Sequence, residues 1–193
     1  MAFQGLFNET SYNVIMKALI YIDHYPEELK RQVHWLIEKK TLGNYLLSKY
    51  KEPHTLSSDK ALYTYVMELR SQYLRKSEPV TKVIYDGKIS DINDALGLHR
   101  ISIKNHGGRL RSKSEIRIAT LFKNVPEPFL KMICVHELAH LKEKEHNKAF
   151  YALCEKMEPS YHQLEFDVRL YLVHLELFGK LYEKASLPND KDV

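Results

Sequence analysis

The chain has 193 residues, of which 44% are hydrophobic, 11% aromatic and 28% charged, a composition typical of a folded globular protein. No apolar run approaches the roughly 18 residues that a membrane-spanning helix needs, and the N-terminus lacks the cationic and apolar regions of a signal peptide. Two cysteines, Cys134 and Cys154, are too few for a disulfide framework and fit a reducing compartment. We therefore expect a cytoplasmic protein with no membrane partner.

The net charge of +4 is small, but the charges are unevenly distributed. Between Arg70 and Arg117, eleven Lys or Arg residues stand against five Asp or Glu residues, so the middle of the chain is basic. A solvated surface of mixed charge is the simplest interpretation. The alternative is a groove for an anionic substrate or for nucleic acid, which Arg109 and Arg111 would contact.

The part of the chain from about residue 9 to residue 75 has helical periodicity. Pro26, followed by the acidic residues Glu27 and Glu28, predicts the start of a helix. A second, short helix is expected in the segment 42–50, and a third after the candidate N-cap residues at 57–59.

The periodicity changes near Pro79. Residues 80–90 predict a strand and a turn, and the segments 99–105 and 114–122 alternate polar and apolar residues as half-buried strands do. A further helix is expected over about 129–142, after Pro126 and Pro128. This order predicts an α+β fold with two parts, a helical N-terminal extension over 1–77 and a second domain over 78–193.

The motif that carries chemistry is His136-Glu137-Leu138-Ala139-His140, which lies within the last of these helices. Residues four apart lie on one helical face, so both imidazoles can bind one ion while Glu137 reaches beside it as a base. A single histidine at such a position is usually a hydrogen-bonded core residue. Two histidines with an intervening glutamate favour a metal site, and zinc, as one ion, is the most plausible metal.

A catalytic zinc site needs a third protein ligand, for which we select His146. On an unbroken helix His146 would lie about 280° around the axis from His136. The helix must therefore end near residues 142–145, and Asn147 is a plausible N-cap for a new helix. Glu165 and, less favoured, Asp167 are the alternatives for the third ligand.

Three segments together resemble the YgjP-like metallopeptidase family, which is related to the WLM and SprT-like groups. They are the active helix His-Glu-Leu-Ala-His-Leu-Lys, His146 with the following Lys-Ala-Phe, and Met-Glu-Pro-Ser-Tyr ending at Tyr161. The resemblance covers about residues 78–175. It implies a zincin-like fold in which His136, His140 and His146 bind zinc and Glu137 is the catalytic base. It also implies that the strand 114–122 lies at a sheet edge above the metal, where an extended peptide can add as a strand.

Three functions remain open at this point. The first is a zinc metallopeptidase with a polypeptide substrate, and the second is a metal-dependent nucleoside triphosphate pyrophosphohydrolase. The third is a non-enzymatic, zinc-stabilised module that binds nucleic acid or protein. Three visible ligands instead of four favour a catalytic site over a structural one. The candidates for contacts with the substrate or the transition state are Tyr161, His106 and Arg111.

Overall fold

A computed structural model describes residues 15–89 and 114–183. The expected strand at 99–105, together with His106, Arg109 and Arg111, lies outside the described residues. The chain divides into two compact units, one formed by residues 54–164 and the other by the residues up to 53 together with those from 165 onward. The boundaries of these units differ from the expected domain boundary between residues 77 and 78, which stays a prediction.

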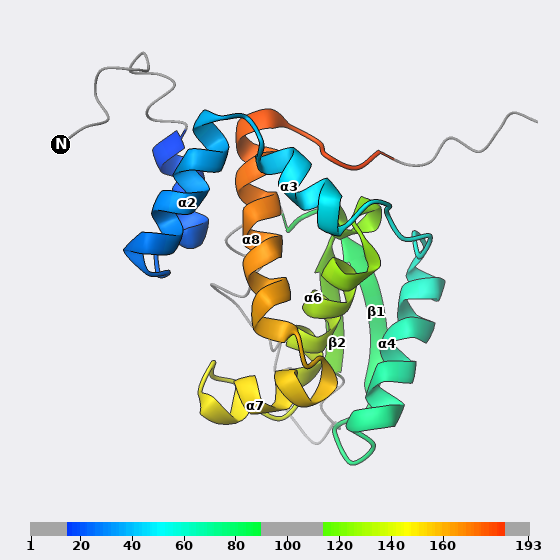
Figure 1. The fold of residues 1–193 in the computed structure, drawn as a ribbon. Coiled ribbons are helices and arrows are strands. Elements are labelled where there is room, and N and C mark those ends of the chain that lie inside the picture. Colours follow the sequence, from blue (N-terminus) through cyan, green and yellow to red (C-terminus); the bar gives the residue numbers. More distant parts are fainter. Residues whose placement is uncertain (1–14, 90–113, 184–193) are drawn as a thin grey trace, which may run out of the picture. The chain divides into compact units, whose positions relative to one another are not determined.

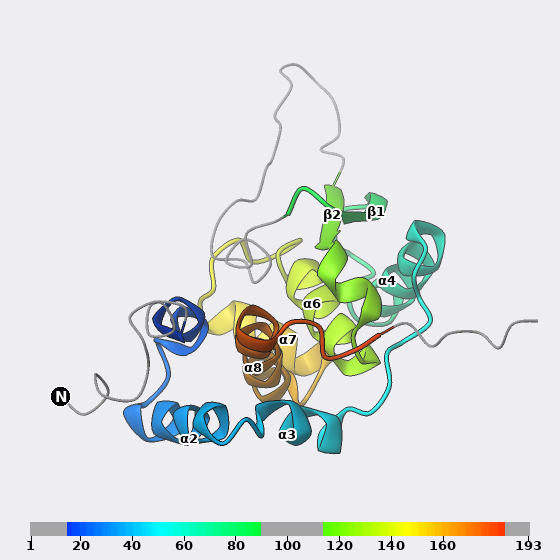
Figure 2. The same ribbon diagram turned by 90° about the horizontal axis from the view of Figure 1, so that it is seen from above.

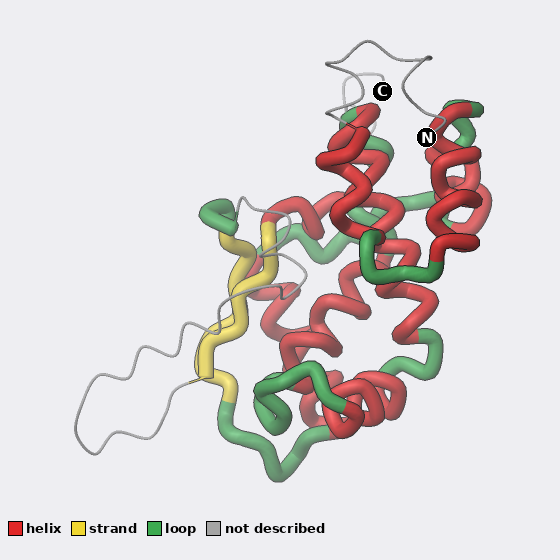
Figure 3. The backbone as a smooth tube through the Cα atoms, turned by 90° about the vertical axis from the view of Figure 1, so that its left-hand side faces the viewer, coloured by secondary structure: helices red, strands yellow, loops and turns green. Residues whose placement is uncertain are grey.

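The unit formed by residues 54–164 contains a parallel pair of strands, β1 (Val80–Asp86) and β2 (Ser114–Ala119). Figure 3 shows the two strands side by side in yellow. On β2, Ile116 and Ile118 are buried and Arg117 between them is exposed, as the alternating pattern predicts. The small sheet expected from the sequence is therefore present.

The strand β2 is shorter than the predicted segment 114–122. Ala119 pairs with Asp86, the last residue of β1, so the chain beyond Ala119 has no pairing partner in that strand. It continues instead as a short 3-10 helix, Thr120–Asn124. Phe122 is buried in this turn, and its carbonyl accepts a hydrogen bond from Nε2 of His54 (2.8 Å).

Two helices of the same unit, α4 (Asp59–Tyr73) and α6 (Glu127–Ala139), pack on the strands and on each other. Figure 2 shows both on the same side of β1 and β2. As predicted, α4 begins at a side-chain cap, because the hydroxyl of Ser58 accepts the backbone N–H of Ala61 (3.2 Å). The carboxylate of Asp59 accepts the N–H of Tyr85 (2.9 Å), which joins the start of α4 to β1.

The helix α7 (Lys148–Met157) follows α6 and packs against it. The last helix, α8, spans Tyr161–Phe178 (Figure 1). Its first residues, up to Leu164, belong to the unit of residues 54–164. From Glu165 onward, its residues belong to the other unit.

The other unit is helical. It contains α2 (Glu27–Glu38), which starts directly after Pro26 as predicted, and α3 (Leu42–Lys49). Asp167 of α8 is fully buried there, where its carboxylate accepts hydrogen bonds from Lys49 (2.5 Å) and the hydroxyl of Tyr50 (2.7 Å).

The mixture of helices with a small sheet confirms the α+β class. Across residues 15–89 and 114–183, no helix has both the length and the apolar character needed to cross a membrane.

Candidate metal centre

Three histidines from two sides of a helix break come together in the unit of residues 54–164. His136 and His140 lie one turn apart at the end of α6, which stops at Ala139. The chain then turns, and α7 starts when the side chain of Asn147 accepts the backbone N–H of Phe150 (3.0 Å). This break returns His146, the residue just before the cap, to the other two histidines.

The three Nε2 atoms face one another. Nε2 of His136 lies 3.2 Å from Nε2 of His140 and 3.2 Å from Nε2 of His146, and the latter two atoms are 3.1 Å apart. His136 is buried, His140 is partly buried and His146 is exposed. The cluster therefore runs from the interior to the surface of its unit.

These distances fit a bound metal ion. Tetrahedral zinc with Zn–N distances of 2.0–2.1 Å would separate its nitrogen ligands by about 3.3 Å, close to the spacing in the cluster. Nδ1 of His140 lies 3.0 Å from the carbonyl oxygen of Glu143 and must carry a hydrogen to donate to it. Nε2 of His140 then presents a lone pair to the cluster, which is the arrangement that a metal ligand needs.

The imidazoles are held by an aromatic side chain and by a tyrosine hydroxyl. The buried ring of Phe150 lies 4.7 Å from the rings of His140 and His146 and 5.0 Å from that of His136, measured between centroids. The hydroxyl of Tyr161 lies 2.8 Å from Nδ1 of His136. These contacts limit how far the rings can rotate, and so they favour one arrangement of the three Nε2 atoms.

Glu137 follows His136 directly on α6 and is partly buried. Burial raises the pKa of its carboxyl from 4.5 to about 7, because desolvation disfavours the charged form. A carboxyl with a pKa in this range next to a candidate metal site suits proton transfer near neutral pH.

The two alternatives for the third ligand have other partners. Glu165 accepts a hydrogen bond from Arg169 (2.8 Å), and Asp167 accepts its hydrogen bonds from Lys49 and Tyr50. Among the described residues, the cluster of possible metal ligands consists of the three histidines alone. Tyr161, a candidate for substrate contact, is fully buried beside His136.

Sequence reasoning missed two parts of this site. In the sequence, Phe150 stands out only as part of the motif shared with the family, and nothing points to the carbonyl of Glu143. Only the position of Phe150, three residues after the cap at Asn147, could have indicated that its ring faces the histidines. The role of a backbone carbonyl has no signal in the side-chain pattern.

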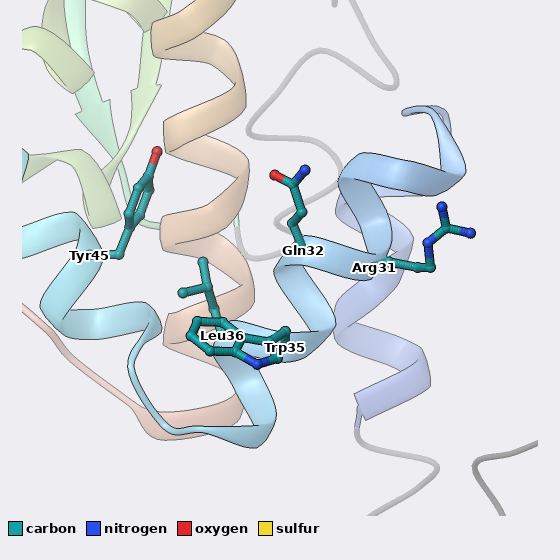
Figure 4. A pocket seen from close by; sticks show the side chains of 5 residues that line it. All are labelled: Arg31, Gln32, Trp35, Leu36 and Tyr45. Atoms are coloured by element: carbon teal, nitrogen blue, oxygen red, sulfur yellow. The ribbon is translucent and has the colours of Figure 1, made fainter.

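A separate pocket of about 470 Å³ lies in the helical unit. Figure 4 shows its lining side chains, with Arg31 pointing away from Trp35. The lining residues are Arg31, Gln32, Trp35, Leu36 and Tyr45. Since none of them is a His, Cys, Asp or Glu, this pocket is not a candidate for the metal centre.

Comparison with known proteins supports the chemistry of the cluster. Residues 90–168 match a family model described as YgjP-like, metallopeptidase domain. The chain is also 55% identical over 162 residues to a protein of Escherichia coli (strain K12) named UTP pyrophosphatase, an alignment that covers 84% of this chain and 97% of the relative. The chain belongs to the YgjP-like family.

The match to the YgjP-like family confirms the resemblance inferred from the active helix and its flanking segments. No solved structure gives a significant match to the chain. Family membership and the three-histidine cluster together support a metal-dependent hydrolase.

Proposed function

We propose that this protein is a zinc-dependent nucleoside triphosphate pyrophosphohydrolase and that UTP is among its substrates. The observation that carries the proposal is the 55% identity to a protein named UTP pyrophosphatase, across 97% of that protein's length. Such extensive identity favours a shared reaction over peptide hydrolysis, the first of the three functions that the sequence leaves open. The three-histidine cluster supports it, because three imidazole nitrogens are a ligand set that catalytic zinc sites use.

A zinc ion held by His136, His140 and His146 would supply Lewis-acid chemistry that activates water and polarises a phosphoryl oxygen. In the proposed reaction, the water oxygen bonds to the α-phosphorus while the bond between that phosphorus and the bridging oxygen breaks. The products are a nucleoside monophosphate and pyrophosphate. Such a reaction needs a base for the proton of water and an acid for the leaving group.

Glu137 is the proposed base. Burial raises the pKa of its carboxyl, and a cation bound by the three histidines would act in the opposite direction and favour the ionised form that a base needs. It accepts the proton from the attacking water and later gives it to the departing pyrophosphate. We also propose that His106 and Arg111 contact the substrate or the transition state. Both side chains can donate hydrogen bonds to the negatively charged oxygens of a triphosphate.

Peptide hydrolysis is the second candidate, and the description of the family as a metallopeptidase domain favours it. Within the described residues, β2 pairs with β1 and with no second strand, so a polypeptide substrate could add along its other edge. If this candidate is correct, we also expect the zincin-like fold that the resemblance implies.

Binding of nucleic acid to the basic middle segment stays a prediction. Two of its described basic residues are already paired with acids, since Lys82 contacts Glu115 (3.0 Å) and Arg117 contacts Asp86 (2.7 Å). Such pairing reduces the positive charge available for an anionic partner on this strand pair.

The expected cytoplasmic location is likewise a prediction.

One experiment separates the candidate functions. Zinc-loaded protein is incubated in parallel with UTP, CTP, ATP, GTP and an unfolded casein, and pyrophosphate release and peptide cleavage are measured, with Glu137→Gln as the variant. We expect pyrophosphate release from UTP, at least 100-fold slower in Glu137→Gln because general-base catalysis contributes about 10²–10⁴-fold. Casein cleavage that depends on Glu137, without pyrophosphate release, would establish the peptidase instead. Turnover of neither substrate class would leave the binding module as the better account.

A further inference from the structure

We infer that Tyr161 is a positioning residue of the metal centre, which fixes the orientation and the tautomer of His136 through a hydrogen bond to Nδ1. The inference rests on the metal-binding part of the proposed function. It differs from the substrate contact expected from the sequence, because the tyrosine would act through a metal ligand.

The first step is the position of the hydroxyl. Tyr161 is fully buried, and its hydroxyl oxygen lies 2.8 Å from Nδ1 of His136, an ordinary hydrogen-bond distance. The two rings are nearly parallel, with an interplanar angle of 20° and centroids 6.5 Å apart. A buried tyrosine hydroxyl normally needs a polar partner. Here one partner is Nδ1 of His136, the ring nitrogen that does not face the other two histidines.

The second step is the direction of the hydrogen bond. Nε2 of His136 faces the other two histidines, so it must present a lone pair if the cluster holds a cation. The hydrogen of the neutral imidazole then lies on Nδ1, which donates to the phenolic oxygen of Tyr161. If the tyrosine donated instead, Nε2 would carry a hydrogen pointing into the cluster and could not bind metal.

The third step is how the fold delivers Tyr161. It is the first residue of α8, and its N–H donates to the carbonyl of Glu158 (2.9 Å). The carboxylate of Glu158 in turn accepts the N–H of Ser160 (3.0 Å) and forms an ion pair with Lys131 (2.6 Å). Lys131 lies on α6, the helix that carries His136. The turn before α8 is therefore tied to the same helix as the histidine.

The fourth step is the division of roles among the ligands. His140 is oriented by the carbonyl of Glu143, whereas His136 is oriented by a side chain that can be changed without altering the backbone. Partners of this kind are worth about 10- to 100-fold in metal affinity when removed. Tyr161 therefore offers a test of positioning that the other hydrogen bond does not.

The experiment compares Tyr161→Phe with Tyr85→Phe. Tyr85 is another buried tyrosine of the same unit, and its hydroxyl donates to the carbonyl of Leu56 (2.7 Å). Both variants lose one buried hydroxyl and keep the ring, so general destabilisation should affect them alike. Zinc affinity is measured by competition with a chromophoric chelator, with no substrate present.

We expect Tyr161→Phe to bind zinc about 10- to 100-fold more weakly and Tyr85→Phe to match the wild type. In zinc-loaded wild type, a long-range ¹H–¹⁵N spectrum should show the hydrogen of His136 on Nδ1, protected from exchange with water. That protection should be lost in Tyr161→Phe.

Three results would overturn the inference. Equal zinc affinity in Tyr161→Phe and wild type would remove the positioning role, and loss of turnover at saturating zinc would then indicate a substrate contact. Equal weakening in both variants would indicate general destabilisation. Failure of the wild type to bind zinc would overturn the proposed metal centre itself. In the first two results the wild type still binds zinc, so they test the role of Tyr161 alone.

Discussion

Nε2 of His146 lies 3.1 Å from Nε2 of His140, although the two residues are six apart and α6 ends before either of them. The return of the chain depends on where α7 begins. The cap at Asn147 sets that start, and His146 is the residue immediately before it. The third histidine of the cluster is therefore positioned by a helix boundary.

Loss of this cap should weaken metal binding. Asn147→Ala removes the acceptor for the N–H of Phe150 and should cost about 1 kcal/mol of stability. It should also lower zinc affinity, because the backbone at His146 is less constrained, and Asn147→Asp should restore both. Thermal melting and zinc competition measure the two effects.

Ser58→Ala is the matched control, since Ser58 caps α4 in the same unit through the N–H of Ala61. It should lose similar stability and keep the zinc affinity of the wild type. Unchanged zinc affinity in Asn147→Ala would show that the cap does not position His146.

Gly43 of α3 should resist substitution by alanine even though alanine has the higher helix propensity. A Cβ atom at this position would lie 2.8 Å from Nε2 of His174 and 3.2 Å from Cδ1 of Leu181. His174 is 9% exposed and has little room to move aside. Gly43→Ala should therefore destabilise the protein by about 1–3 kcal/mol, the usual cost of overpacking.

A double-mutant cycle with His174→Ala tests the cause. With the imidazole removed, Gly43→Ala should become neutral or stabilise by up to about 1 kcal/mol. Gly87→Ala, whose Cβ would meet only Cγ2 of Thr120 at 3.8 Å, should change stability by less than about 0.5 kcal/mol. The same cost for Gly43→Ala in both backgrounds would rule out the contact with His174 as the cause.

His54 should make folding stability depend on pH. Its Nδ1 accepts the N–H of Leu56 (3.0 Å), so the neutral ring donates from Nε2 to the carbonyl of Phe122. Burial lowers the pKa of this imidazole below its ordinary value of 6.5. Below pH 6.5 the unfolded chain binds the proton more readily than the folded one. The stabilisation is thus complete above pH 6.5 and is lost as the pH falls through the lowered native pKa.

Melting temperatures between pH 7.5 and pH 5 measure this dependence in wild type and in His54→Gln. The glutamine has no titrating ring, so the fall in stability over this range should be smaller in the variant. Identical pH profiles for the two proteins would assign the dependence to other groups.

The amino-acid pattern predicted the helices well, because their start signals are local. Pro26 before α2, Ser58 before α4 and Asn147 before α7 each stand where a helix begins. The metal site could be predicted for the same reason. Two histidines at helical spacing and the cap residue after His146 are both local features of the sequence.

The rest depended on contacts between distant residues. The end of β2 at Ala119 is set by the end of β1, with which it pairs across more than thirty residues. The alternation of polar and apolar residues in β2 alone does not predict where this pairing stops. The contact between Tyr161 and His136 depends on the turn held by Glu158 and Lys131. Tyr161 could be selected from the sequence, but its position beside Nδ1 of His136 depends on this ion pair between residues far apart in the chain.

The most direct test of the central claim is the zinc content of purified wild type, His146→Ala and His162→Ala. His162 is an exposed histidine of the same unit that contacts Glu155 (2.8 Å) and lies outside the cluster. If His136, His140 and His146 form the metal centre, the wild type and His162→Ala hold one zinc ion per chain and His146→Ala loses it while remaining folded. One zinc ion retained in His146→Ala, with unchanged affinity, would contradict the account.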